Sequence, residues 1–141
     1  MRVRCTSNRG VDLPDLYLDP AGGYAATTTF ELERSKEYVV YALTIRRGGI
    51  WYYILDETGT PYPIWNPAPL FEVVDARMSR YWTFGFTEDG LRAGSAIFAF
   101  GEWARDPADY YDRLTDGEER AEATFAQFRE LLDLEFVDSS V

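Results

Sequence analysis

Histidine is absent from this chain of 141 residues, and cysteine and lysine each occur once, as Cys5 and Lys36. Without an imidazole there is no Ser–His or Cys–His nucleophile pair and no histidine-ligated zinc or haem. A lone cysteine cannot form an intrachain disulfide, a thiolate zinc site or an iron–sulfur cluster, and it is typical of a reducing compartment. What remains is carboxylate chemistry, oxygen-ligated Mg²⁺ or Ca²⁺, a tyrosine or lysine acting alone, or no chemistry. We therefore predict no catalytic residue, no metal site and no cofactor.

Long apolar runs are also missing. No stretch of 18 consecutive apolar residues occurs, and the first residues, MRVRC, are not followed by an apolar run of signal-peptide length. A chain of this size can bury roughly 70% of its unfolded surface in a single core. We therefore expect one domain over residues 1–141, a cytoplasmic location and no membrane partner.

Negative charge is concentrated towards the carboxyl end. The chain has 24 acidic and 14 basic residues, a net charge of −10, and residues 106–141 hold 11 of the acidic and three of the basic ones, or −8. The chain as a whole repels phosphate groups, so direct nucleic-acid binding is not expected. A nearly neutral, aromatic body followed by an acidic segment is typical of a surface that meets a positively charged partner.

The spacing of β-formers and turn residues predicts strands as far as residue 103. Arg46-Arg47-Gly48-Gly49 joins two β-rich runs into a hairpin, and four prolines between residues 61 and 69 confine any strand there to an edge. Residues 80–86 alternate strictly, which places Trp82, Phe84 and Phe86 on one face. The predicted strands are Arg2–Cys5, Glu37–Ile45, Ile50–Leu55, Leu70–Asp75, Arg80–Phe86 and Ala96–Trp103.

From Asp106 the hydrophobic period becomes that of a helix. Asp106-Pro107 predicts a short helix to about Leu114. Thr115, with Glu118 three positions on, resembles a capping box and predicts a long helix that ends near Leu134. At 100° per residue this helix has a narrow apolar stripe, which must pack on the sheet. The stripe consists of Ala121, Phe125, Phe128 and Leu132.

The side of the long helix opposite this stripe is almost uniformly negative. Carboxylates near the carboxyl end oppose the helix dipole, and like charges three residues apart cost a few tenths of a kcal/mol each. The charge therefore indicates a recognition surface, with a merely solvated face as the alternative. The candidate partner-binding residues are Glu119, Glu122, Glu130 and Asp133, extended by Asp109, Asp112 and Asp116, with Tyr110 or Tyr111 as exposed aromatic anchors.

An alternative ligand groove is suggested by the aromatic and proline-rich region before residue 70. Aromatic rings beside prolines are typical of grooves that bind peptides or small ligands. Because side chains alternate along a strand, about half of these rings must point outward or be covered by the helices. Core packing is the favoured interpretation. The residues of the alternative groove are Trp51, Tyr53, Tyr62 and Trp65.

Five short segments between Arg4 and Asp75 carry a resemblance to a known family. They are Cys5 with Asn8 and Gly10, residues 36–40 (KEYVV), residues 51–56 (WYYILD), Trp65, and residues 70–74 (LFEVV). In this order they resemble small bacterial SH3-like barrels of the immunity and defence type. The resemblance implies a compact single-domain barrel that binds a partner and does not catalyse a reaction. The chain has no Ala-Leu-Tyr-Asp-Tyr run, so a polyproline groove is not carried over.

Together these observations predict an α+β domain. Residues 1–75 form an SH3-like, bent antiparallel β-sheet or barrel, residues 76–103 extend it by two strands, and residues 106–135 pack on it as a cap of two helices. The predicted function is non-catalytic: an immunity or antitoxin-like protein that neutralises a basic toxin or nuclease domain through its acidic helix face. An SH3-like peptide- or small-ligand-binding module and a small carboxylate-dependent enzyme are the alternatives.

Overall fold

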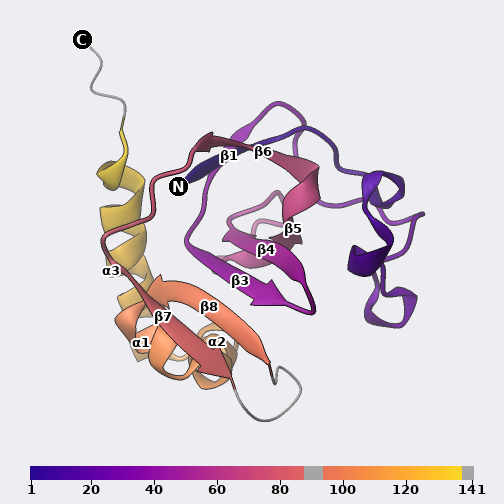
Figure 1. Cartoon of the computed structure of the whole chain (residues 1–141). Coiled ribbons are helices and arrows are strands. Elements are labelled where there is room, and N and C mark those ends of the chain that lie inside the picture. Colours follow the sequence, from indigo (N-terminus) through magenta and orange to yellow (C-terminus); the bar gives the residue numbers. More distant parts are fainter. Residues whose placement is uncertain (88–93, 138–141) are drawn as a thin grey trace.

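Two antiparallel sheets and three carboxyl-terminal helices build the fold (Figure 1), in a computed structural model that describes residues 1–87 and 94–137. The smaller sheet has the strand order β2-β1-β6, and the larger has the order β5-β4-β3-β8-β7. The smaller sheet contains β1 Arg2–Cys5, β2 Glu37–Val39 and β6 Phe71–Asp75. The larger contains β3 Ala42–Arg46, β4 Gly49–Ile54, β5 Ile64–Pro67, β7 Trp82–Thr87 and β8 Ser95–Phe100. The helices are α1 Gly101–Arg105, α2 Pro107–Thr115 and α3 Glu119–Glu135.

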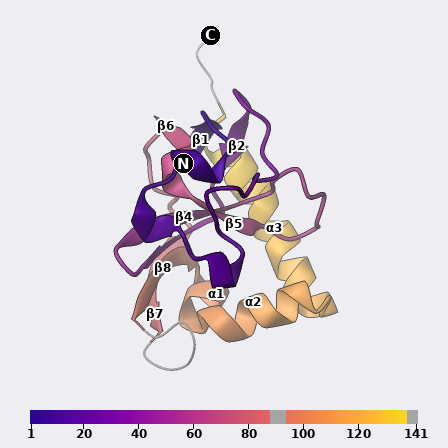
Figure 2. The ribbon, with the colours of Figure 1, turned by 90° about the vertical axis from the view of Figure 1, so that its right-hand side faces the viewer.

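This architecture confirms the predicted α+β class, the antiparallel pairing and the packing of the carboxyl-terminal helices on the sheet. The strands do not close into a barrel. Of the two later strands, β8 pairs with β3 and β7 pairs with the other side of β8, so that strands from both halves of the chain share one sheet. Figure 2 shows α1 and α2 together at one end of the molecule, with α3 rising from them.

The strand predicted over residues 37–45 is divided between the two sheets. The N–H of Val40 donates to Met1 O, whereas the N–H of the next residue, Tyr41, donates to Tyr53 O in the larger sheet. Both side chains are buried, which an alternating strand over one core does not allow. The predicted strand is therefore interrupted where the chain crosses from the smaller to the larger sheet. This crossing depends on tertiary contacts, and no local turn residues mark it in the sequence.

Two further boundaries differ from the prediction. The last strand ends at Phe100, and α1 begins at Gly101. The adjacent residues Trp103 and Ala104 are both buried, which helix geometry allows, whereas successive side chains of a strand point to opposite faces. The predicted capping box is also wrong. Thr115 is the last residue of α2, where its hydroxyl donates to Asp112 O, and α3 begins only at Glu119. The start of α2 at Pro107 is as predicted.

Each face of the larger sheet contributes to a separate hydrophobic core. Between the two sheets lie fully buried side chains of Val3, Ile54 and Leu70, with Cys5 as a small apolar member, as expected. Between the larger sheet and the helices lie Trp103 and Tyr110. In the described part of the chain, no helix is long and apolar enough to cross a membrane.

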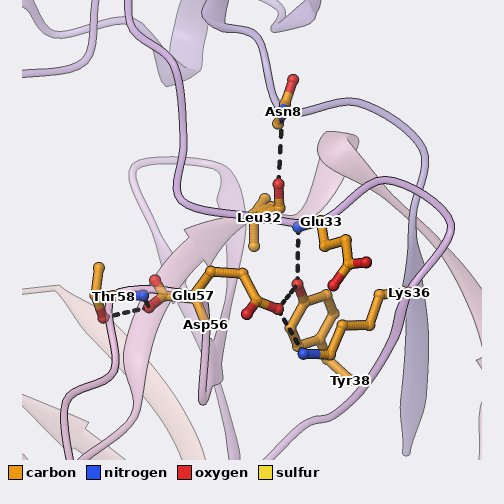
Figure 3. A network of polar contacts seen from close by, with 8 residues as sticks. All are labelled: Asn8, Leu32, Glu33, Lys36, Tyr38, Asp56, Glu57 and Thr58. Carbon is orange, nitrogen blue, oxygen red and sulfur yellow. Dashed lines mark hydrogen bonds and ion pairs between the residues drawn. The ribbon is translucent and has the colours of Figure 1, made fainter.

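The long first loop, residues 6–36, contains three single 3-10 turns, at Gly10–Asp12, Asp15–Tyr17 and Pro20–Gly22. Its end is fastened by a polar network around Glu57, shown in Figure 3. The hydroxyl of Tyr38 donates to Glu57 Oε1 at 2.8 Å and accepts from the N–H of Glu33 at 2.9 Å, and the ammonium of Lys36 lies 2.5 Å from the same carboxylate oxygen. The loop is therefore an ordered layer over the core between the sheets.

A candidate partner-binding groove on helix α3

Helix α3 packs on the sheet through the stripe that its sequence predicts. Ala121, Phe125 and Leu132 are buried, and Phe128 stacks on Phe100 with ring centroids 4.4 Å apart. The ring of Phe125 meets Tyr41 edge-on at 5.5 Å. These contacts fix the rotation of the helix about its axis, and with it the direction in which the acidic residues point.

A groove of about 630 Å³ lies along α3, and three of its lining residues are predicted acidic residues. Its volume is within the range of roughly 300–1,000 Å³ of small-molecule sites. The lining combines an apolar floor with three carboxylates and one guanidinium. It consists of Pro61, Glu122, Phe125, Ala126, Arg129, Glu130, Asp133 and Leu134. The structure thus brings Glu122, Glu130 and Asp133 together, while Glu119 is exposed outside this lining.

The carboxylate of Asp133 is held in place by a hydrogen bond from a residue next to the larger sheet. Its Oδ1 accepts a hydrogen bond of 2.6 Å from the hydroxyl of Tyr41, and its Oδ2 lies 3.7 Å from Nε of Arg129. Burial, reinforced by the carboxylate of Asp133, raises the pKa of Tyr41, so the hydroxyl remains a donor at neutral pH. Glu122 and Glu130 lie on the exposed side of the helix.

The acidic extension predicted on α2 is partly neutralised. Arg113 lies 3.0 Å from Asp109, 2.9 Å from Glu118 and 3.5 Å from Glu102. The carboxylates of Glu118 and Asp109 raise the pKa of the Arg113 guanidinium. Asp112 and Asp116 are exposed at the end of α2. The negative potential of the helical cap is therefore centred on α3.

One of the two predicted tyrosine anchors lies inside the core, and the other is half-buried. Tyr110 is completely buried, and its hydroxyl donates to Ala121 O at 2.8 Å, so the prediction for this residue is wrong. Tyr111 is half-buried and donates to Pro63 O at 2.7 Å, with its ring against Trp103. Tyr110 and Leu114, four residues apart, form the buried side of α2, and this spacing was the signal in the sequence.

The apolar part of the groove was not predicted. Ala126 and Leu134 continue the four-residue steps that also contain Glu122 and Glu130, so they lie on one line along the helix. Leu134 is 65% exposed. This spacing was visible in the sequence, whereas Pro61, on the opposite wall, comes from a loop that only the fold places there.

The residues of the alternative aromatic groove divide between two environments. The rings of Trp51 and Trp65 lie 5.1 Å apart beside a cavity of about 50 Å³, and Nε1 of Trp65 donates to the hydroxyl of Tyr24 at 2.9 Å. Tyr53 and Tyr62 instead pack against Tyr111, with centroid distances of 5.2 and 6.3 Å. A cavity of this size is well below the roughly 300 Å³ of a typical ligand site.

Comparisons with protein-family models, with curated proteins and with solved structures find no match for this chain. The resemblance to SH3-like immunity proteins therefore stays a prediction. Among residues 1–87 and 94–137, no group of three or more cysteine and carboxylate side chains has an arrangement that could hold a metal ion.

Proposed function

We propose that this protein is a non-catalytic binding protein of the immunity or antitoxin type, which neutralises a basic toxin or nuclease domain. The observation that carries the proposal is the groove along α3, where Glu122, Glu130 and Asp133 surround an apolar floor. An exposed apolar strip can supply binding free energy, and the surrounding charges can supply partner choice and orientation.

Electrostatic steering is the first step of the proposed mechanism. The net charge of −10 attracts a basic domain from a distance, and association steered in this way is faster by 10-fold to 1,000-fold at low ionic strength. In the complex, the carboxylates of Glu122 and Glu130 pair with lysine or arginine side chains of the partner. Because these side chains would otherwise hold the phosphates of a nucleic-acid substrate, their occupation inhibits the partner.

Co-expression with the product of the neighbouring gene tests the proposal. We expect this protein to relieve the toxicity of that product and to co-purify with it. No toxicity together with no complex removes the main support for the immunity function. A complex that survives loss of the acidic groove but not the change Trp65→Ala supports the aromatic module instead.

A charge-reversal pair tests the site within that complex. Glu122→Lys with Glu130→Lys is expected to lower the association rate at least about tenfold at low salt, with a much smaller effect at high salt. The matched control is Asp112→Lys with Glu119→Lys, which changes the net charge equally at exposed helical positions outside the groove. Equal effects of the two pairs would assign the steering to net charge and not to the groove.

A further inference from the structure

Strand β7 exposes two phenylalanines on the side of the larger sheet that faces away from the helices. Phe84 is 60% exposed and Phe86 is 51% exposed. Gly85 lies between them on the opposite, helix-covered side, where a Cβ atom would come within 2.0 Å of Ala104 O. The predicted alternation is therefore present, but the large side chains point to water and the glycine points to the core.

The phenylalanines are part of a continuous apolar face. Phe84 lies opposite Phe98 in the register of β7 with β8, their rings meet edge-on at 5.6 Å, and Phe86 lies opposite Ala96. On β3 and β4 the same face continues through Ile45 and Ile50. The exposed parts of these side chains leave on the order of 300–400 Å² of apolar surface in water, the size of the largest patch on an ordinary monomer.

Within residues 1–87 and 94–137, no strand pairs with the outer edge of β7. Strand β7 is the last strand of the larger sheet, and it pairs with β8 in regular register over all six residues. Its sequence, WTFGFT, contains no charge and no proline, which are the usual protections of an edge strand. The other edges have such protection: β5 ends in Pro67, β6 contains Glu72 and Asp75, and β2 is only three residues long with Glu37.

Hydrogen bonding identifies which groups of this edge face outward. The N–H of Trp82 donates to Ser79 O, outside the sheet. Because residues of an antiparallel strand direct their backbone groups alternately to either side, Phe84 and Phe86 also direct N–H and C=O away from β8. The open edge thus offers two donors and two acceptors, next to the two exposed rings.

We propose that β7 pairs antiparallel with β7 of a second copy of this chain, about a twofold axis at Gly85. In this register Phe84 lies opposite the partner's Phe86, so that four backbone hydrogen bonds form and the four phenylalanine rings make two cross-strand pairs. Gly85 faces the partner's Gly85 as a non-hydrogen-bonded pair, where backbones approach most closely. The larger sheets of the two copies thereby become one sheet of ten strands. This inference does not depend on the proposed function.

Charge and area set the strength of this dimer. No like charges meet across β7, but each copy carries a net charge of −10, so the copies repel at long range. The interface buries less than the roughly 800 Å² per partner of a stable complex. The dimer is therefore reversible and is strengthened by salt, the opposite salt dependence to that of a basic partner in the groove.

Sedimentation equilibrium of the full chain, from about 10 µM to about 1 mM at low and high salt, tests the proposal. We expect a monomer–dimer equilibrium that shifts to dimer with salt. Phe84→Lys with Phe86→Lys should raise the dissociation constant at least about tenfold. Val73→Lys, at a 49% exposed position on the edge strand β6, is the matched control and should leave it unchanged. A monomer at every concentration overturns the proposal. The proposal is also overturned if Val73→Lys raises the dissociation constant as much as Phe84→Lys with Phe86→Lys does.

Disulfide trapping tests the register. Thr83 and the partner's Thr87 form the neighbouring non-hydrogen-bonded pair, at a separation that suits a disulfide. The double variant Thr83→Cys, Thr87→Cys should therefore form covalent dimers under mild oxidation, while each single variant stays mainly monomeric. Cross-linking of the single variants to the same extent as the double variant would contradict a twofold axis at Gly85.

Discussion

The hydroxyl of Tyr41 donates a 2.6 Å hydrogen bond to Oδ1 of Asp133, which lies 92 residues later in the chain. Tyr41 directly precedes β3, at the crossing between the two sheets, and Asp133 lies near the carboxyl end of α3. One contact thereby joins the sheet to the helix and holds one carboxylate of the groove in place. The stability of the helical cap and the shape of the candidate site are consequently linked.

The change Tyr41→Phe tests this link. Removal of the hydroxyl leaves the ring in the core and deletes a hydrogen bond to a charged acceptor, so we expect a loss of about 1–2 kcal/mol in the free energy of unfolding. Urea denaturation followed by circular dichroism measures it. Tyr81→Phe, which keeps the ring contact with Phe128, is the control and should change stability by less than about 0.5 kcal/mol. Equal losses would show that the bond to Asp133 contributes nothing specific.

Local patterns in the sequence predict those parts of the fold that local physics decides. The apolar stripe of α3 follows from helix geometry, and the alternation predicted over residues 80–86 follows from strand geometry. The division between Val39 and Ala42 was not predictable, because consecutive amides there bond to different sheets. Which face of β7 packs against the helices was also not predictable. Alternation places Phe84 and Gly85 on opposite faces of the strand, but it does not determine which of these faces the helices cover.

The same limit applies to the candidate site. Glu122 and Glu130 could be placed on one side of a helix from their spacing alone, and the structure places both in the groove lining. The position of Pro61 could not be predicted, because the opposite wall of the groove is formed by a loop that is distant from α3 in the sequence. Tyr110 was misplaced for a different reason: tyrosine is a typical anchor of binding surfaces, but here the carbonyl of Ala121 accepts a hydrogen bond from its hydroxyl inside the core.

Glu57 gives the protein an acid-sensitive contribution to stability. Its carboxylate accepts hydrogen bonds from Lys36 and Tyr38, and these two donors lower the pKa of Glu57 (Figure 3). A carboxyl group whose folded pKa is lowered stabilises the fold above its unfolded pKa of about 4.3, and this contribution is lost as the pH falls towards the folded pKa.

The change Glu57→Gln should therefore flatten the pH dependence of stability below about pH 5, and lower stability at neutral pH by less than about 1 kcal/mol because the pair is partly exposed. Thermal unfolding between about pH 3 and pH 7 measures both effects. Glu31→Gln, at an exposed position of the long first loop, is the matched control. A variant that loses stability in acid as steeply as the original chain would exclude Glu57 as a source of the pH dependence.

At Gly85 a single added methyl group should lower stability. A Cβ atom there would lie 2.0 Å from Ala104 O, a backbone atom that cannot move without displacing α1. We expect Gly85→Ala to lower the free energy of unfolding by about 1–3 kcal/mol. Gly101→Ala is the matched control, since a Cβ atom at Gly101 meets nothing within 4 Å and alanine favours the helix that begins there. Denaturant unfolding should separate the two variants clearly, and equal stability would mean that α1 does not pack on β7 through this glycine.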